Sequence, residues 1–300
     1  MTRKKKISLL IAVVIILTTA LVITLHLLTQ KTKTPVVEVE EIKPSVTRST
    51  EIPEPDNPQM IGTSVEGRFI ENYTYGHGTT TILFVGGVHG GYEWNSVLLA
   101  YTFIDELESG KIKIPNGVNI KIIPSLNPDG VFRVTGKEGR FTPTDVRTNT
   151  KNGEGRFNAN NVDLNRNFAC KWQPNSTWRN QKVSAGTSAF SEPETQTLKK
   201  FVETIKPTAV IFWHSQANAV YASECEEGIL PNTLKLMDTY AKASGYKPIS
   251  AFDAYPVTGD AEGWLASIGI PAITVEMSTH ENIEWVKNKA GVEAVLELYQ

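Results

Sequence analysis

Histidines and glutamates at the ends of apolar segments could bind a metal ion and activate water. His89 and Glu93 lie four positions apart in GGVHGGYEWN, residues 86–95, while His214 and Glu276 lie near the ends of two later apolar runs. Two imidazoles and a carboxylate, with a fourth position open, form one ligand set of catalytic zinc. The His89–Glu93 pair alone is weak evidence, because an isolated pair also arises by chance. The spacing therefore raises the hypothesis of a metal site, which the remaining chain must support.

The elements that carry these side chains alternate between two kinds. Apolar, β-rich runs predict strands over residues 79–87, 118–126, 208–214 and 270–277. Apolar residues at helical spacing predict helices over residues 93–107, 230–245 and 282–299, the last with a break at Gly291. Strands that alternate with helices indicate an α/β domain with a largely parallel central sheet flanked by helices.

Three of the candidate side chains lie at or just after a predicted strand end: His89, His214 and Glu276. Open α/β sheets bind ligands in a crevice beyond the carboxyl ends of their strands. We therefore expect these three side chains to meet at one edge of the sheet.

Two further segments carry turn and capping signals. NPDG, residues 127–130, predicts a turn that stops the second strand, and residues 133–160 predict a long loop. Residues 191–194, SEPE, predict a capping box in which Ser191 is the cap and Glu194 reaches back, opening a helix that ends near Ile205. Both glutamates of this segment are interpreted as structural.

Six motifs together resemble the zinc carboxypeptidases of the carboxypeptidase A family, especially their small bacterial members. The motifs are NPDG at 127–130, VDLNRNF at 162–168, SEPET at 191–195, HSQ at 214–216, YPVTGDAEGW at 255–264 and TVEM at 274–277. That family usually has His-x-x-Glu at its first ligand pair, whereas this turn is one residue longer. Glu93 is nevertheless the only acidic residue there that could be the ligand.

The resemblance implies a mixed, largely parallel sheet and one zinc ion per chain, bound by His89, Glu93 and His214. Asp163 would accept a hydrogen bond from His89, as carboxylates near metal-bound histidines do; an aspartate that caps a turn is the alternative. Glu276 would be the general base. A buried strand glutamate would be unfavourable without such a role.

The resemblance also implies an arginine that stabilises the oxyanion and a pair that binds the terminal carboxylate. Arg156 takes the first position, with Arg147 as the alternative. Asn165 and Arg166 match the second, where a guanidinium binds a carboxylate through two parallel hydrogen bonds.

Two residues match positions around the substrate's last side chain. Tyr255 corresponds to a mobile tyrosine that covers the substrate. Glu262 falls at the base of the specificity pocket, where an acid would favour Lys, Arg or the amine end of diaminopimelate. A solvent-facing Glu262 is the alternative. His26, His77 and His280 have no motif support and are interpreted as non-ligands.

The N-terminal segment predicts a membrane anchor. Residues 1–6 form a basic cytoplasmic N-terminus, residues 7–29 a transmembrane signal-anchor, residues 30–59 a flexible tether rich in Pro, Thr and Glu, and residues 60–300 the catalytic domain. The basic flank places the catalytic domain outside the cytosol. A cleaved signal peptide and secretion are the alternative.

Composition restricts the partners. A net charge of −2 does not suggest nucleic acid binding. Cys170 and Cys225, the two cysteines of the chain, could form a disulfide in an oxidising compartment.

The leading hypothesis is a membrane-anchored zinc metallocarboxypeptidase that acts on peptides with a free C-terminus, with cell-wall stem peptides as one substrate class. A zinc acylase similar to succinylglutamate desuccinylase and aspartoacylase is an alternative, as is an inactive peptide-binding module.

Overall fold

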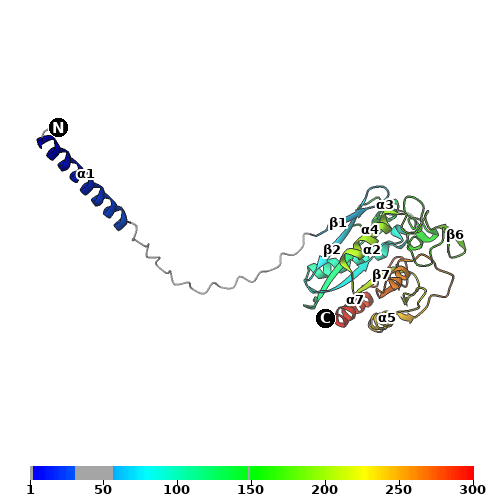
Figure 1. Cartoon of the computed structure of the whole chain (residues 1–300). Helices are drawn as coiled ribbons and strands as arrows, with labels where there is room; N and C mark the ends of the chain where they lie inside the picture. Colours follow the sequence, from blue (N-terminus) through cyan, green and yellow to red (C-terminus); the bar gives the residue numbers. More distant parts are fainter. Residues whose placement is uncertain (1–2, 31–56, 148) are drawn as a thin grey trace. The chain divides into compact units, whose positions relative to one another are not determined.

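The computed structural model describes residues 3–30, 57–147 and 149–300, and the side chains of residues 3–13, 29, 30 and 151 lie outside this description. The chain divides into two compact units, residues 1–51 and 52–300. Each unit is described by itself (Figure 1).

The first unit contains one helix, α1 (Arg3–Gln30), among its described residues. No helix in the described parts of the chain is long and apolar enough to cross a membrane. The span predicted over residues 7–29 includes side chains that lie outside the description, as do residues 31–56 of the predicted tether. Both remain predictions.

The second unit is built around a mixed sheet. Within the described residues, this sheet has eight strands, in the spatial order β1 (Gln59–Thr63), β2 (Phe69–Tyr75), β4 (Val118–Ile123), β3 (Thr80–Val85), β7 (Ala209–Ser215), β10 (Ala272–Met277), β8 (Ala219–Ala222) and β9 (Lys247–Ile249). The central strands β4, β3, β7 and β10 run parallel to one another. They are the four strands predicted from the sequence, and the α/β class with a mixed, largely parallel sheet is confirmed.

Helices cover both faces of this sheet. They are α2 (Trp94–Glu108), α3 (Pro128–Thr135), α4 (Pro193–Ile205), α5 (Pro231–Ser244), α6 (Ala261–Ser267) and α7 (Trp285–Leu298). One apolar cluster joins the sheet to α2, α5 and α7, and a second joins the opposite face to α4 and α6. A separate hairpin is formed by β5 (Asn175–Trp178) and β6 (Gln181–Ser184).

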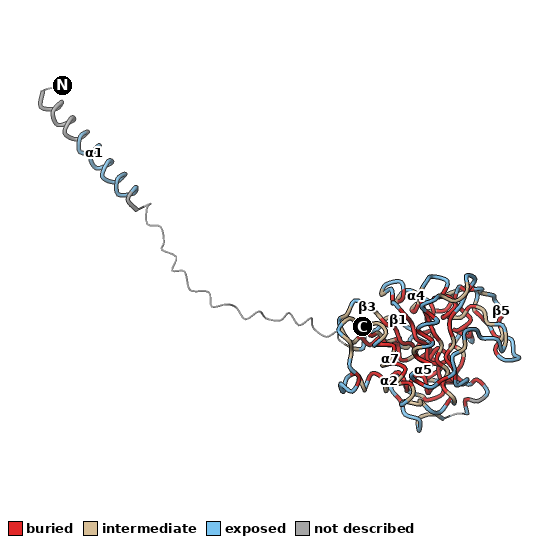
Figure 2. The backbone as a smooth tube through the Cα atoms, turned by 90° about the horizontal axis from the view of Figure 1, so that it is seen from below, coloured by how far each residue is buried: buried red, intermediate tan, exposed pale blue. Residues whose placement is uncertain are grey.

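Alternate side chains of β3 pack on opposite faces of the sheet. Ile82 and Phe84 pack into the first cluster, and Leu83 and Val85 into the second. Successive strand side chains point to opposite faces, so a strand buried on both faces is a continuous apolar run. The central strands accordingly lie in the buried interior of the unit (Figure 2).

The segment NPDG begins a helix, whereas the sequence predicts a turn there; the strand does end before it, at Ile123. Asn127 is the N-cap of α3, where its side chain accepts a hydrogen bond from the Gly130 amide at 2.9 Å, and Pro128 is the first helical residue. Asparagine caps and a proline in the first turn both favour helix initiation. The predicted loop over 133–160 is therefore shortened at its start.

The predicted capping box is wrong. The cap of α4 is Glu192, because the Ser191 hydroxyl donates to the Glu192 carboxylate at 2.7 Å instead of accepting from the helix. Glu194 accepts from the Val65 amide and from Asn158, each at 3.1 Å. Both glutamates therefore hold neighbouring segments together, in keeping with their predicted structural role.

Gly291 does not break α7, contrary to prediction. A Cβ atom at this position would lie 2.5 Å from a ring carbon of Tyr240 on α5. The glycine instead permits close packing of the two helices.

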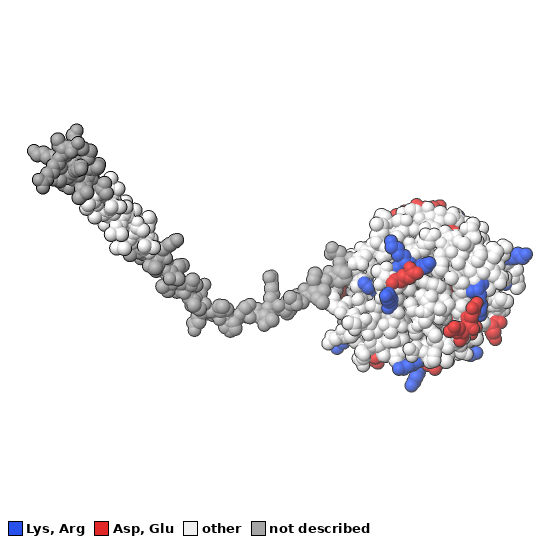
Figure 3. Space-filling model, in the orientation of Figure 1, with Lys and Arg blue, Asp and Glu red and all other residues white. Residues whose placement is uncertain are grey.

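Charged side chains do not form a single-sign field on the face shown in Figure 3, where Lys and Arg lie in small groups with Asp and Glu. This distribution agrees with the near-neutral net charge.

Candidate active site

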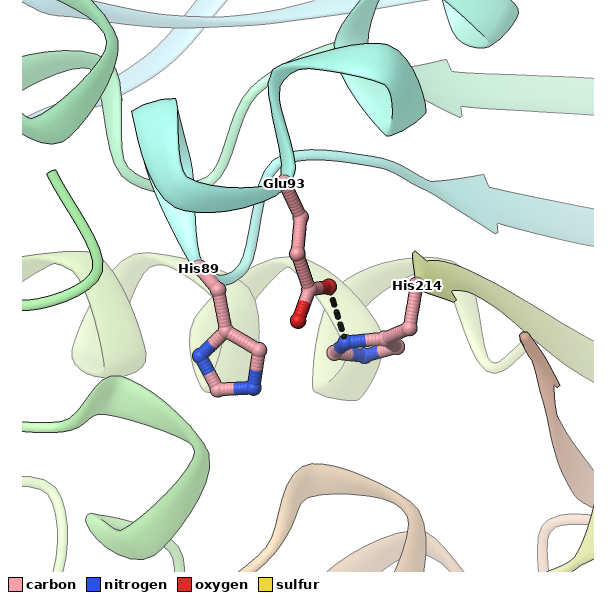
Figure 4. A group of neighbouring side chains, drawn as sticks. All are labelled: His89, Glu93 and His214. Atoms are coloured by element: carbon pink, nitrogen blue, oxygen red, sulfur yellow. Dashed lines mark hydrogen bonds and ion pairs between the residues drawn. The ribbon is translucent and has the colours of Figure 1, made fainter. Parts of the chain in front are cut away.

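Three predicted ligands meet beyond the carboxyl ends of the central strands. His89 follows β3, Glu93 precedes α2, and His214 lies on β7. Each residue is at most 4% exposed, and candidate ligand atoms from all three lie within 4.8 Å of one another. Figure 4 shows the three side chains around one space, with His214 Nδ1 2.9 Å from Glu93 Oε2.

The longer turn between His89 and Glu93 is accommodated by two glycines. Residues Gly90–Glu93 form a 3-10 helix, and Gly90 adopts a left-handed φ of 46°. A Cβ atom at Gly91 would lie 2.5 Å from the Gly130 carbonyl oxygen. Glycine tolerates both constraints, so one additional residue does not separate the ligands.

The charge distribution of this cluster suits a cation. Burial and the neighbouring Arg156 hold the pKa of His89 well below its usual value, which favours the neutral imidazole that binds metals. Burial alone would lower the pKa of His214, but the Glu93 and Glu262 carboxylates outweigh it and raise that pKa well above its usual value. The Glu93 and Glu262 carboxylates therefore stabilise positive charge beside His214.

Unsatisfied ring nitrogens support the same conclusion. Among the described residues, His89 Nδ1 and His214 Nε2 are buried without a hydrogen-bond partner. Buried polar atoms are nearly always paired. Two imidazoles with free nitrogens and one carboxylate fit zinc.

Asp163 lies behind the cluster and connects it to an arginine. Its Oδ1 is 3.6 Å from His89 Nδ1, beyond hydrogen-bond distance, while its Oδ2 accepts from Arg156 Nε at 3.0 Å and from Arg156 Nη2 at 2.9 Å. The predicted partner of His89 is therefore adjacent to it, but its hydrogen bonds go to Arg156 and the Asn165 amide.

Arg156 lies at the cluster and its alternative does not. Its guanidinium is buried, with Nη1 3.8 Å from Glu93 Oε1, and lies over the ring of Trp178. Arg147 is exposed, with its guanidinium against Gly136. Only Arg156 is placed to contact a group bound at the cluster.

Glu276 lies beside His214 because the two residues are register partners in parallel strands β10 and β7. Its Oε2 atom is buried without a hydrogen-bond partner in the described structure. Burial, and the negative charge of Glu93, raise the pKa of the Glu276 carboxyl to about 8. Such a carboxyl is suited to accept and release a proton near neutral pH.

Arg166 presents a guanidinium with two unused donors. Its Nε and Nη2 donate to the Thr177 carbonyl, and its Nη1 to the Asn165 carbonyl. A guanidinium has five N–H groups, so these three bonds leave one on each terminal nitrogen. No ion pair of Arg166 occurs within the described residues, although the side chain is 3% exposed. The neighbouring Asn165 Oδ1 accepts from the Ala261 amide at the start of α6.

A pair of carboxylates lies at the start of α6. Glu262 is buried, accepts from Thr274 Oγ1 at 2.9 Å and lies 3.4 Å from His214 Nε2, so it does not face solvent. Asp260, which the sequence analysis missed, caps α6 by accepting from the Gly263 amide at 2.7 Å. Burial and Glu262 raise the pKa of Asp260 to about 6. The sequence signal that could have identified Asp260 is its position directly before the short helix α6.

One cavity of about 550 Å³ contains nearly all of these groups. Of the ten predicted site residues, nine line it, and Asp163 lies behind its wall. Tyr255, half-buried against Phe252, lies in this lining. Cys170, another lining residue, forms the predicted disulfide with Cys225.

Comparisons with known proteins agree with this geometry. A sequence model of the family described as zinc carboxypeptidase matches residues 47–295. Gamma-D-glutamyl-L-diamino acid endopeptidase 1 of Lysinibacillus sphaericus is 24% identical over 246 residues, which cover 74% of this chain and 60% of that protein. Murein peptide amidase A of Escherichia coli (strain K12) is 32% identical over 131 residues, covering 40% of this chain and 50% of that protein.

A solved structure shares the fold. The crystal structure of the murein-tripeptide amidase from Escherichia coli O157 superposes with a TM-score of 0.59 at 20% identity, covering 84% of this chain and 96% of that chain. This chain spans 60% or less of the length of the two curated relatives described above.

Proposed function

Because the chain belongs to the zinc carboxypeptidase family, we propose that it releases the C-terminal residue of peptides by zinc-dependent hydrolysis. One observation carries the proposal: the cavity that contains His89, Glu93 and His214 also contains Arg166, a buried guanidinium with two unused donors. A bidentate guanidinium is suited to a carboxylate. The cavity therefore offers a hydrolytic centre and a site for a free C-terminus.

The chain's own residues have distinct tasks in this mechanism. Zinc held by the three ligands supplies Lewis acidity and lowers the pKa of water. Glu276 takes the proton of the attacking water and passes it to the leaving amine. Arg156 donates to the oxygen that becomes negative as the scissile carbonyl is attacked. Arg166 holds the terminal carboxylate, which orients the bond to be cut.

The substrate we propose carries a second amine on its last residue. Glu262 and Asp260 lie in the same cavity as Arg166 and provide negative charge for that amine. The name of one relative, gamma-D-glutamyl-L-diamino acid endopeptidase 1, specifies a diamino acid, and the name of a second, murein peptide amidase A, specifies a cell-wall peptide. We therefore propose cell-wall stem peptides ending in a diamino acid as the substrate class.

The experiment is hydrolysis of L-Ala-γ-D-Glu-L-Lys by the zinc-loaded full chain. Its C-terminal amide serves as one control and chelated protein as another. We expect release of lysine from the free acid alone. Absence of lysine release by protein that binds zinc would refute the proposal and favour the acylase or the inactive binding module.

We also propose that residues 7–29 anchor the protein in a membrane, with the catalytic unit on the extracytoplasmic side. The support is the uncharged run that follows the basic residues 1–6. Sedimentation with membranes after alkaline carbonate washing, and digestion of the catalytic unit by external protease in spheroplasts, would test it. Recovery in the soluble fraction would contradict it.

A further inference from the structure

A second groove adjoins the cavity. Its volume is about 410 Å³, and it shares Arg179 and Gln216 with the central cavity. The residues that line it are Arg179, Gln216, Thr279, His280 and Glu281. None of the residues placed around the terminal carboxylate lines this groove. A peptide that extends across the metal ligands from Arg166 would therefore place its acyl part here.

His280 lines this groove and carries a buried ring nitrogen, Nε2, that has no hydrogen-bond partner among the described residues. Asn95 donates to the Thr279 and Asn282 carbonyls, so its Oδ1 is the acceptor for the Ser215 hydroxyl at 3.0 Å. Because that hydroxyl proton is already used, Ser215 Oγ must accept from His280 Nδ1, at 2.7 Å.

The network thus assigns the proton of His280 to Nδ1 and leaves Nε2 as a bare acceptor. His280 is 4% exposed, and Nε2 has no partner within the described residues. A buried acceptor without a donor is unfavourable, so a bound group that provides an N–H would satisfy it.

Arg179 provides a cation at the same groove. It lies in the turn between β5 and β6, where Nη2 donates to the Tyr92 hydroxyl at 3.0 Å and the guanidinium carbon lies 5.0 Å from the Trp178 ring centre. The described ion pairs include none for Arg179, and Glu281, the carboxylate of the groove, forms none either. Since the ring of Tyr92 also lies against His280 in a tilted contact, at 4.4 Å between ring centres, both side chains contact one tyrosine.

We infer that Arg179 and His280 form an acyl-side subsite that recognises a residue with a free carboxylate next to its N–H. This inference rests on the proposed function, because a γ-linked glutamate is such a residue. Its side-chain carboxyl forms the scissile amide, so its α-carboxylate remains free. Arg179 binds that carboxylate, and His280 Nε2 accepts the N–H on the same α-carbon. An ordinary α-linked residue has no carboxylate there.

The test compares three substrates of the zinc-loaded full chain. They are N-acetyl-γ-D-glutamyl-L-lysine, the same compound with its α-carboxylate converted to carboxamide, and an analogue in which an ester oxygen replaces the glutamyl N–H. Lysine release is measured as kcat/KM. A charge-assisted hydrogen bond predicts that wild type prefers the carboxylate over the carboxamide by about 10- to 100-fold. The neutral hydrogen bond predicts a preference of about 2- to 10-fold for the N–H over the ester oxygen.

Two variants separate recognition from structure. Arg179→Gln is expected to lower kcat/KM for the carboxylate substrate to the level of the carboxamide, so that the preference for the carboxylate is lost. His280→Asn retains a donor for Ser215 but lacks Nε2, and is expected to remove only the preference for the N–H. Arg147→Gln, the same substitution as at Arg179 but at an exposed arginine outside both cavities, is the matched control and keeps both preferences.

The outcomes distinguish a failure of the proposed subsite from a failure of the proposed function. Equal cleavage of carboxylate and carboxamide by wild type would overturn the subsite and leave the proposed function intact. An equal loss on both substrates in Arg179→Gln would assign that residue a structural role and also overturn the subsite. Cleavage of neither compound would overturn the proposed function and the subsite with it.

Discussion

Replacing Arg166 with methionine tests whether the enzyme recognises a free C-terminus. Methionine keeps an unbranched apolar stem but lacks the guanidinium, so the variant loses the two donors that the Thr177 and Asn165 carbonyls leave unused. Each hydrogen bond to a charged group contributes about 1.5–3 kcal/mol, so two contribute about 3–6 kcal/mol. At about 1.4 kcal/mol per factor of ten, kcat/KM for a free-acid peptide should fall by about 10²- to 10⁴-fold.

The assay measures kcat/KM for L-Ala-γ-D-Glu-L-Lys and for its C-terminal amide. Wild type should prefer the acid, and Arg166→Met should show no preference, because only the acid engages the lost donors. Zinc content and the unfolding temperature are measured in parallel, since the variant also leaves two carbonyls without donors. A variant that keeps the preference for the acid, or loses equal activity on both peptides while folded, would refute the reasoning.

Four further results are expected. Glu276→Gln should lower kcat by about 10²- to 10⁴-fold. Its zinc content in metal analysis should be unchanged, because the unpaired Oε2 contributes no hydrogen bond to the fold. A kcat near that of wild type would exclude Glu276 as the base. Glu262→Gln should reduce the kcat/KM ratio of C-terminal lysine over leucine by about 10- to 100-fold, the loss of one charged hydrogen bond, and an unchanged ratio would place the amine elsewhere. Chelation should abolish activity and lower the unfolding temperature in calorimetry, since zinc at 100 times its Kd adds about 2.7 kcal/mol to the free energy of unfolding. Identical unfolding temperatures with and without zinc would contradict a bound metal. Replacing Cys170 and Cys225 together with serine should lower the free energy of unfolding by about 2–4 kcal/mol, because the bond links residues 55 apart; equal denaturation midpoints for the two proteins would argue against it.

The candidate site residues at the carboxyl ends of the central strands were predictable, because buried parallel strands are easy to recognise in the sequence. A strand buried on both faces is a continuous apolar run, as β7 is from Ala209 to Trp213, so the polar residue that ends the run, His214, is visible in the sequence. His214 and Glu276 could thus be assigned to one edge of the sheet before their register was known. The disulfide required the fold, since only the tertiary structure brings Cys170 to Cys225.

The features that sequence reasoning missed depend on contacts between distant segments. Ser191 has the residue type of a cap, but a neighbouring carboxylate takes its hydroxyl. The acceptor on His280 exists only because Asn95, far away in sequence, fixes the direction of the Ser215 hydroxyl. No local pattern encodes such a chain of hydrogen bonds, and an isolated histidine without a motif was reasonably interpreted as a non-ligand. The last two strands at one end of the sheet, β8 and β9, are short, which leaves little periodicity to detect.

The 3-10 turn Leu164–Arg166 connects the candidate metal site to the guanidinium proposed to bind the terminal carboxylate. Asp163, directly before it, is bonded to Arg156 beside the metal ligands, and Arg166, at its end, carries the unused donors. This short turn therefore sets the span between the candidate metal ligands and the unused donors of Arg166, and in the proposed function that span would admit one residue. The proposed stem peptide would end in glutamate after one cut, and its charge would have the same sign as those of Glu262 and Asp260. Electrostatic repulsion in the pocket would then stop trimming after a single residue, so each stem would be shortened once and released.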